Sequence, residues 1–165
     1  MEKEVYLQKL EERLSYYYDI EKNISYMKMS FDMYARFFEK NDRYIVSKKA
    51  VIYSSEINQH IFVKHLPTLE MEDLDQLGHI AKMAVMDYVK PKEDHMSSLI
   101  SMVVLVDSMP SLEVQKKLKK YSYYKSFLFG FHGWVNIGFL LVDINSFDMI
   151  YNSKGREGKE NFILT

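Results

Sequence analysis

The sequence predicts a single α+β domain, with a mixed, mainly antiparallel sheet of five to seven strands covered by an N-terminal helix and a central helix. Three observations lead to this fold class. Apolar residues alternate with polar ones after residue 29, they recur at helical spacing in residues 68–90, and they form nearly continuous runs at 99–106 and 127–144. A chain of 165 residues fits one domain, so we assign residues 1–165 to it.

The N-terminal helix is expected over residues 2–18. Its apolar residues are spaced three or four apart, which places them on one helical face: Leu7, Leu10, Leu14 and Tyr17. The run Tyr16–Tyr18 holds more aromatic surface than one face requires. We expect it to pack on the sheet of its own chain, or otherwise on a second copy.

An antiparallel meander of three or four strands is expected over residues 29–66. Phe31, Met33, Ala35 and Phe37 alternate with polar neighbours, as in a half-buried strand near 29–38. Asn58-Gln59 indicates a turn, and Pro67 ends the meander. The other expected strands cover residues 44–46, 50–55 and 60–65.

The central helix is the clearest element of the sequence. Acidic residues fill its first turns and lysines follow its last turn, which complements the helix dipole. Thr68 is the expected N-cap, and Pro91 stops the helix. Its buried stripe is expected to hold Leu74, Leu77, Ala81, Ala84 and Tyr88.

The second half of the chain is expected to be mostly strand. The run 99–106 is typical of a central strand covered on both faces, and Ser111 can cap a short helix over 112–120. A hairpin of strands near 122–131 and 134–143 is expected to turn at His132-Gly133. A strand at 147–151 and a turn or loose tail over 152–165 complete the expected order.

The sequence of the apolar hairpin region does not indicate a membrane span. Only 17 residues separate Lys125 from Asp143, they include three polar side chains, and three glycines weaken any helix there. The N-terminus is charged from Glu2 onward and has no secretory signal, so we expect a cytoplasmic protein without a membrane partner.

Composition restricts the chemistry that the chain can carry. The absence of cysteine excludes disulfides, thiolate nucleophiles and Cys-ligated metals, and the net charge of −1 lacks the basic excess common in nucleic-acid modules. We expect no cofactor. We also expect no metal site, because no two histidines have helical i, i+4 spacing; they are His60, His65, His79, His95 and His132.

The run KKLKKYSYYK is the first candidate binding site. Lysines neutralise phosphates and tyrosine rings stack on bases, so this pairing suits single-stranded nucleic acid or another anionic ligand. The simpler interpretation is a solvated helix C-terminus followed by a strand. The candidate residues are Lys116, Lys117, Lys119, Lys120, Tyr121 and Tyr124.

The second candidate site follows from element order. The expected order of helix, three-strand meander, helix and strand over residues 1–107 resembles the restriction-endonuclease-like core. That resemblance implies an acidic residue on one strand and a Glu-x-Lys pair on the next, which together hold Mg²⁺. Asp32, Glu56 and Lys64 are the candidates, but position 62, where the second acid should be, is Phe.

No complete catalytic constellation is present in the sequence, while Tyr and Met are abundant, with 13 and 11 residues. We therefore expect a non-catalytic interaction or regulatory domain that associates with itself as a homodimer or with another protein. The alternative is a nucleic-acid-binding or nuclease-like protein, and a metal-dependent nuclease is the main enzymatic version.

Overall fold

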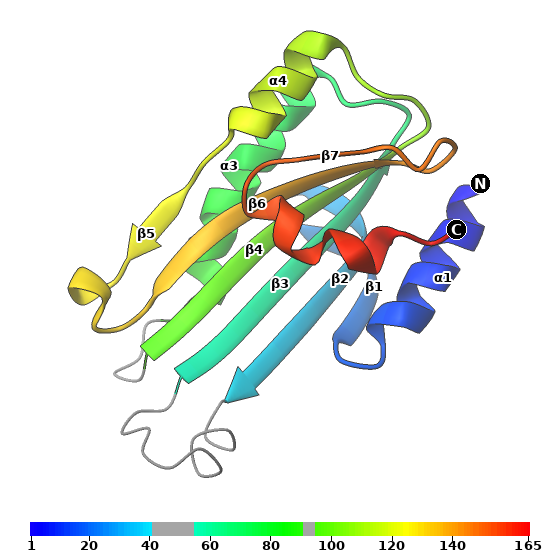
Figure 1. The fold of residues 1–165 in the computed structure, drawn as a ribbon. Helices are drawn as coiled ribbons and strands as arrows, with labels where there is room; N and C mark the ends of the chain where they lie inside the picture. Colours follow the sequence, from blue (N-terminus) through cyan, green and yellow to red (C-terminus); the bar gives the residue numbers. More distant parts are fainter. Residues whose placement is uncertain (41–54, 91–94) are drawn as a thin grey trace.

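A mixed sheet forms the centre of the computed structural model, which describes residues 1–40, 55–90 and 95–165 (Figure 1). In these ranges the strand order is β1-β2-β3-β4-β6-β5, and β7 also pairs with β6. The β3–β4 and β4–β6 pairs are parallel and the other four pairs are antiparallel, which confirms the expected α+β class. The strands are β1 (Asp19–Tyr26), β2 (Met29–Lys40), β3 (Ser55–Leu66), β4 (His95–Val106), β5 (Tyr124–Ser126), β6 (Trp134–Asp143) and β7 (Met149–Tyr151).

Helices cover both faces of the sheet. α1 (Lys3–Leu14) and the 3-10 helix η2 (Gly155–Phe162) lie on one face, where a core cluster joins Leu10 and Phe162 to the sheet (Figure 1). α3 (Met71–Tyr88) and α4 (Leu112–Lys120) lie on the other face, over a larger cluster. A short 3-10 helix, η1 (Leu128–Gly130), forms the tip between β5 and β6. Among the described residues, the elements from α1 to β4 follow the expected order of helix, three strands, helix and strand.

The first three strands differ from the expected meander. β1 was not predicted, because its sequence DIEKNISY is largely polar and exposed, as an edge strand can be. The break expected at Asn58-Gln59 was wrong, since both residues pair with β2 and β4 inside an unbroken β3. The strand expected at 44–46 and residues 50–54 of the strand expected at 50–55 lie outside the described residues, while Ser55 begins β3.

The helices agree with the sequence in position but differ at their ends. α1 stops at Leu14, so Tyr17 is 78% exposed, and Tyr6 is buried in the stripe instead. Glu70, not Thr68, caps α3, in a capping box with Asp73. α4 begins after Ser111 as predicted, and the Ser111 hydroxyl accepts a hydrogen bond from Val114 N.

The hairpin is confirmed in its second strand and corrected in its first. β6 covers Trp134–Asp143, and Gly133 has the positive φ, 96°, that a tight turn requires. β5 contains only three residues, so residues 127–131 are not a strand. They form the tip around η1.

The C-terminal segment is not a loose tail. η2 crosses β6 closely: a Cβ on Gly155 would lie 1.9 Å from the carbonyl oxygen of Phe139, so no larger residue fits there. Phe162 and Leu164 are buried, and the Tyr6 hydroxyl donates a hydrogen bond to Phe162 O at 2.7 Å. The segment is therefore part of the core.

Asn152 holds this crossing together. β5 pairs with residues 134–136 of β6 and β7 pairs with residues 140–142, which leaves a gap on that edge. The Asn152 side chain fills it: Oδ1 accepts hydrogen bonds from Phe139 N and Gly155 N, and Nδ2 donates to Ile137 O and Tyr121 O. All four hydrogen-bonding positions of this buried amide are used.

A buried aromatic cluster lies between the sheet and α3. It contains a polar pair, in which the Tyr34 hydroxyl and His60 Nδ1 lie 2.7 Å apart. Burial lowers the pKa of His60 from its ordinary 6.5 to about 4, and the charge of Arg36 adds to the shift. His60 is therefore neutral at physiological pH. The rings around it are Tyr26, Phe31, Tyr34, Phe62 and Tyr88.

Replacing Asn152 is expected to destabilise the domain strongly. Asn152→Ala leaves the buried N–H groups of Phe139 and Gly155 without these acceptors, and each such loss costs roughly 1–3 kcal/mol. We expect the free energy of unfolding in urea to fall by about 3 kcal/mol or more. Asn145→Ala, which removes a partly exposed amide, serves as the control and should cost less than about 1.5 kcal/mol. Equal costs would contradict the role given to Asn152.

Acid is expected to weaken the fold through His60. The unfolded chain binds a proton at this residue below pH 6.5, while the folded chain does so only near pH 4. The stability from the neutral, buried ring is therefore complete above pH 6.5 and declines toward pH 4, by roughly 3 kcal/mol. Urea unfolding across this range should show a shallower decline for Tyr34→Phe/His60→Leu, which removes both polar partners. Parallel profiles for the two proteins would exclude His60 as the cause.

Candidate functional site

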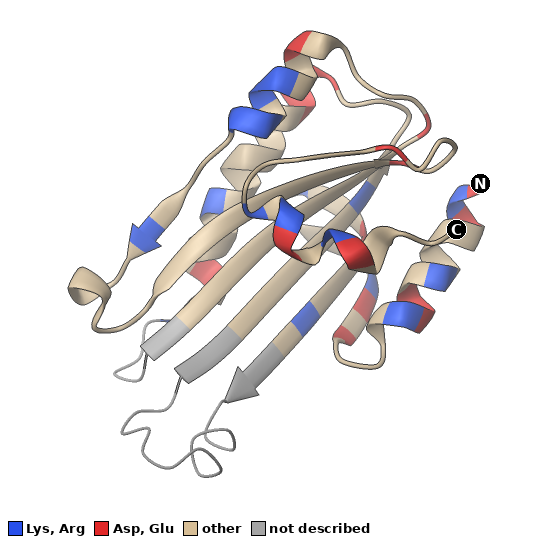
Figure 2. Cartoon of the chain, viewed as in Figure 1, with Lys and Arg blue, Asp and Glu red and all other residues tan. Residues whose placement is uncertain are grey.

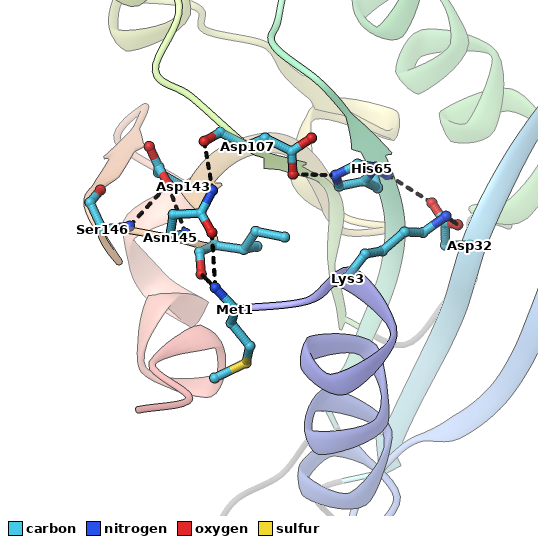
Figure 3. A network of polar contacts seen from close by, with 9 residues as sticks. Met1, Lys3, Asp32, His65, Asp107, Asp143, Asn145 and Ser146 are labelled. Atoms are coloured by element: carbon cyan, nitrogen blue, oxygen red, sulfur yellow. Dashed lines mark hydrogen bonds and ion pairs between the residues drawn. The ribbon is translucent and has the colours of Figure 1, made fainter.

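Asp32, the first predicted catalytic acid, is engaged in structural contacts (Figure 3). The β2–β3 ladder stops at the Met33–Val63 pair, and beyond it Asp32 Oδ2 accepts a hydrogen bond from His65 N at 2.7 Å. The carboxylate thus replaces a main-chain acceptor. Its other oxygen forms an ion pair with Lys3 Nζ at 2.8 Å, and this hydrogen bond raises the pKa of the Lys3 amine, against the opposing effect of burial.

The contacts of Asp32 belong to a larger network at the carboxyl ends of β3, β4 and β6 (Figure 3). His65 Nε2 lies 2.9 Å from Asp107 Oδ1, and Asn145 Nδ2 donates to Asp107 O at 2.9 Å. Asp143 Oδ1 accepts hydrogen bonds from the backbone of Asn145 and Ser146. This is the edge at which open α/β sheets commonly bind ligands, but here the polar groups bind one another and connect α1 to the sheet.

The three candidates for a nuclease site do not meet. Asp32 lines a groove with residues of α1, and Lys64 lines a groove with residues of α3, on the other face of the sheet. Lys64 Nζ donates to Ser30 O at 2.7 Å. Glu56 precedes Lys64 by eight residues on the same strand, a distance of about 26 Å along the chain. Phe62, at the position of the missing acid, is fully buried in the aromatic cluster.

Neither a metal centre nor a membrane-spanning helix is present in the described part of the chain. Within residues 1–40, 55–90 and 95–165, no group of three His, Asp or Glu side chains is arranged to hold a metal ion. No helix in the same ranges combines the length and apolarity that a transmembrane span needs.

The lysine–tyrosine run belongs to a longer segment without acidic residues. Between Glu113 and Asp143 there are five lysines and no Asp or Glu, so the rest of the chain, with 17 basic and 23 acidic side chains, carries a charge of −6. Figure 2 shows this segregation as basic positions along α4 and on β5 with no acidic position between them. A chain with a net charge near zero thus concentrates positive charge in residues 114–142.

Four of the six predicted binding residues are exposed to solvent. Lys116, Lys119, Lys120 and Tyr124 are exposed, and in the described ranges no carboxylate lies within 4.0 Å of these lysines. The other two residues are engaged elsewhere. Lys117 forms an ion pair with Asp75 of α3 at 2.6 Å.

Tyr121 does not face solvent as a binding residue would. Its ring packs edge-on against Phe139, with centroids 4.7 Å apart, and beside Gly78 of α3. Burial raises the pKa of its hydroxyl to about 12. The sequence offers no distinction between Tyr121 and Tyr124, because both follow the same lysines.

Beyond Tyr124 the segment ends in an exposed apolar tip that sequence reasoning missed. Phe129 is 98% exposed, Phe131 70% and Leu128 60%. Leu128 and Phe129 also have positive φ, 46° and 54°, a conformation that costs roughly 1–2 kcal/mol for each side chain with a Cβ. Strained backbone that presents large apolar side chains to water is a recognised indication of a functional contact.

Lys125 connects the tip to the lysines of α4. Its amine lies 5.5 Å from the ring centroid of Phe127 and 4.0 Å from the sulfur of Met86, an exposed residue of α3. The exposed members of this region, together with the half-exposed Lys125, form a surface that we call the docking surface. It consists of Met86, Lys116, Lys119, Lys120, Tyr124, Lys125, Leu128, Phe129 and Phe131.

Comparison with known proteins places the whole fold in one family. Residues 2–164 match the family model of DUF8052, described as a domain of unknown function. The chain belongs to the DUF8052 family. No curated protein and no solved structure matches the chain. The DUF8052 match runs from α1 to the end of η2, so it includes both the Asp32 network and the docking surface.

Asp32 is expected to contribute to stability. Asp32→Ala removes the acceptor of His65 N and the ionic partner of Lys3, and hydrogen bonds to charged groups contribute roughly 1.5–3 kcal/mol. We expect the free energy of unfolding to fall by about 2 kcal/mol. Asp19→Ala, on the neighbouring strand, removes a carboxylate that is 89% exposed and should change it by less than about 0.5 kcal/mol. Unchanged stability in Asp32→Ala would leave this carboxylate free for another role.

Proposed function

We propose that this DUF8052 domain is a non-catalytic docking module that binds an extended anionic partner through the docking surface. The observation that carries the proposal is the combination of an exposed apolar tip with lysines that have no carboxylate within 4.0 Å in the described ranges. Lysines attract an anionic partner over a distance set by the ionic strength, and exposed apolar side chains add contact area once the partner is reached.

The contacts of the candidate catalytic residues support a non-catalytic role. The Asp32 carboxylate has two structural partners, Lys64 lies across the sheet from it, and a buried Phe62 stands where a metal-binding acid would be needed. Metal-assisted hydrolysis requires converging carboxylates around an open site. The proposal therefore assigns Asp32 and Lys64 to the fold and the function to the surface.

We also propose self-association, which the abundance of Tyr and Met favours. Pairing of exposed sheet edges does not favour it. The exposed edge strand β1 carries Asp19, Glu21 and Lys22, and charges of this kind oppose edge-to-edge pairing. A homodimer would therefore have to use another surface. The tip is the most apolar exposed segment among the described residues, so a dimer would compete with the proposed docking for the same side chains.

Binding to labelled heparin, a simple polyanion, tests the proposal. We expect the wild type to bind with an affinity that falls steeply with NaCl concentration, because each lysine on the polyanion releases counterions. Lys116→Ala/Lys119→Ala/Lys120→Ala should bind more weakly and reduce the slope of log affinity against log salt by about 1 per contacting lysine. Fluorescence anisotropy over a salt series measures both quantities.

The matched control is Lys9→Ala/Lys28→Ala/Lys159→Ala, which removes the same charge from other parts of the surface. It should retain the affinity and the slope of the wild type. Equal weakening of heparin binding in both triple variants would show that the polyanion is attracted to the overall charge and not to a defined surface. Mg²⁺-dependent DNA cleavage by the wild type, lost in Asp32→Ala, would contradict the non-catalytic role.

A further inference from the structure

We infer that the anionic partner is the surface of a lipid bilayer, with the tip inserted among the headgroups and the lysines against anionic phosphates. This inference rests on the proposed function and names its partner. Leu128, Phe129 and Phe131 would enter the interface, and Lys116, Lys119 and Lys120 would remain at headgroup level.

Most backbone N–H groups of the tip form hydrogen bonds within it. Gly130 N and His132 N donate to Phe127 O, Phe131 N donates to Leu128 O, and Gly133 N donates to Gly130 O. Phe127 N closes the loop by donating to Gly133 O at 3.0 Å. A segment that enters an apolar phase must have its polar backbone groups paired, because water cannot pair them there. Five of the seven N–H groups in residues 127–133 are paired in this way, while those of Leu128 and Phe129 have no protein partner among the described residues. The tip therefore suits the hydrated headgroup boundary, where water and headgroups can pair the remaining groups, and not the hydrocarbon core.

The side chains of the docking surface suit a bilayer interface better than a nucleic acid. Leu128 and Met86 are largely exposed but have no aromatic face on which a base could stack. Phe and Leu are the usual apolar residues of interfacial segments, and a partly exposed Tyr such as Tyr124 suits the headgroup level. The Lys125 amine lies over the Phe127 ring and beside the Met86 sulfur, and its long side chain would let it turn from this apolar zone toward the phosphates.

The charge of the docking surface also disfavours a second copy of this chain as the occupant. A two-fold contact through the tip would bring the lysines of α4 and β5 near the same lysines of the other copy. Like charges brought together across an interface oppose association. An anionic bilayer presents the opposite charge over a wide area.

Interfacial docking agrees with the absence of a spanning helix in the described ranges. The sequence led us to expect no membrane partner because no segment is long and apolar enough to cross a bilayer. An interfacial contact requires neither that length nor that apolarity. It requires a few apolar side chains that reach about 5–10 Å into the boundary, together with basic residues around them.

Co-sedimentation with vesicles tests the inference on the full chain. One set of vesicles contains phosphatidylcholine alone, and the other contains phosphatidylcholine with about a third phosphatidylglycerol. We expect the wild type to bind the anionic vesicles at least about tenfold more tightly than the neutral ones. Leu128→Ser/Phe129→Ser/Phe131→Ser should weaken that binding by about tenfold or more. Lys116→Ala/Lys119→Ala/Lys120→Ala should abolish the preference for anionic vesicles.

The control for the tip variant is Val5→Ser/Tyr16→Ser/Tyr17→Ser, which removes three exposed apolar side chains at α1 and should bind as the wild type does. Circular dichroism of each variant confirms that it is folded. No binding of wild type to anionic vesicles, or equal loss in the control and the tip variant, overturns the lipid assignment.

Two further measurements separate this inference from the proposed function. If the protein does not bind vesicles but its heparin binding depends on the docking lysines, the proposed docking function is retained and the partner is not lipid. Tighter binding to single-stranded DNA would then indicate a nucleic-acid partner. A tip-dependent dimer in sedimentation velocity without vesicle binding would identify a second copy as the occupant. If neither heparin nor vesicles bind, the lipid assignment and the proposed function both fall.

Discussion

The four hydrogen bonds of Asn152 are the constraint on which the arrangement of the second half of the domain depends. β6 is paired along its outer edge by β5 at one end and by β7 at the other, and the Asn152 amide completes the edge between them. The same amide binds Tyr121 O, directly after α4, and Gly155 N, at the start of η2. It therefore fixes how α4 leads into β5 and how the C-terminal segment crosses the sheet. The tip and the lysines of the docking surface are positioned by this arrangement.

Local periodicity was sufficient to predict the elements that bury one regular face. α3 and α4 were predicted almost to the residue, because charge at their ends and apolar spacing along them agree. β1 escaped prediction because an edge strand needs few apolar residues and takes its hydrogen bonds from a neighbour. The packing of η2 was not predicted because its sequence, GREGKENF, is polar. It depends on the close approach of Gly155 to β6 and on Asn152, neither of which a single sequence reveals.

The candidate sites divide in the same way. The lysines of α4 were found because their pattern is local, but the exposed tip was interpreted as strand since FLFGF is rich in β-forming residues. Only the three-residue length of β5 shows that these side chains reach solvent. The absence of acids from residues 114–142 is a second local signal, which the sequence alone contains. For Asp32, the strand was predictable, while its contacts with Lys3 and His65 depend on the tertiary fold.

The proposed function depends on a difference between two regions. The polar groups of the network at the strand ends bind one another, whereas the side chains of the docking surface are accessible to a partner. The most direct test is to ask whether the tip reaches the apolar phase of an anionic bilayer. Trp134 is the only tryptophan, so Phe129→Trp/Trp134→Phe places a single fluorophore at the tip. With vesicles that contain phosphatidylglycerol and acyl-chain-brominated lipid, its emission should be quenched, while that of Val5→Trp/Trp134→Phe should not. Emission at position 129 that is unaffected by the brominated lipid would contradict the account.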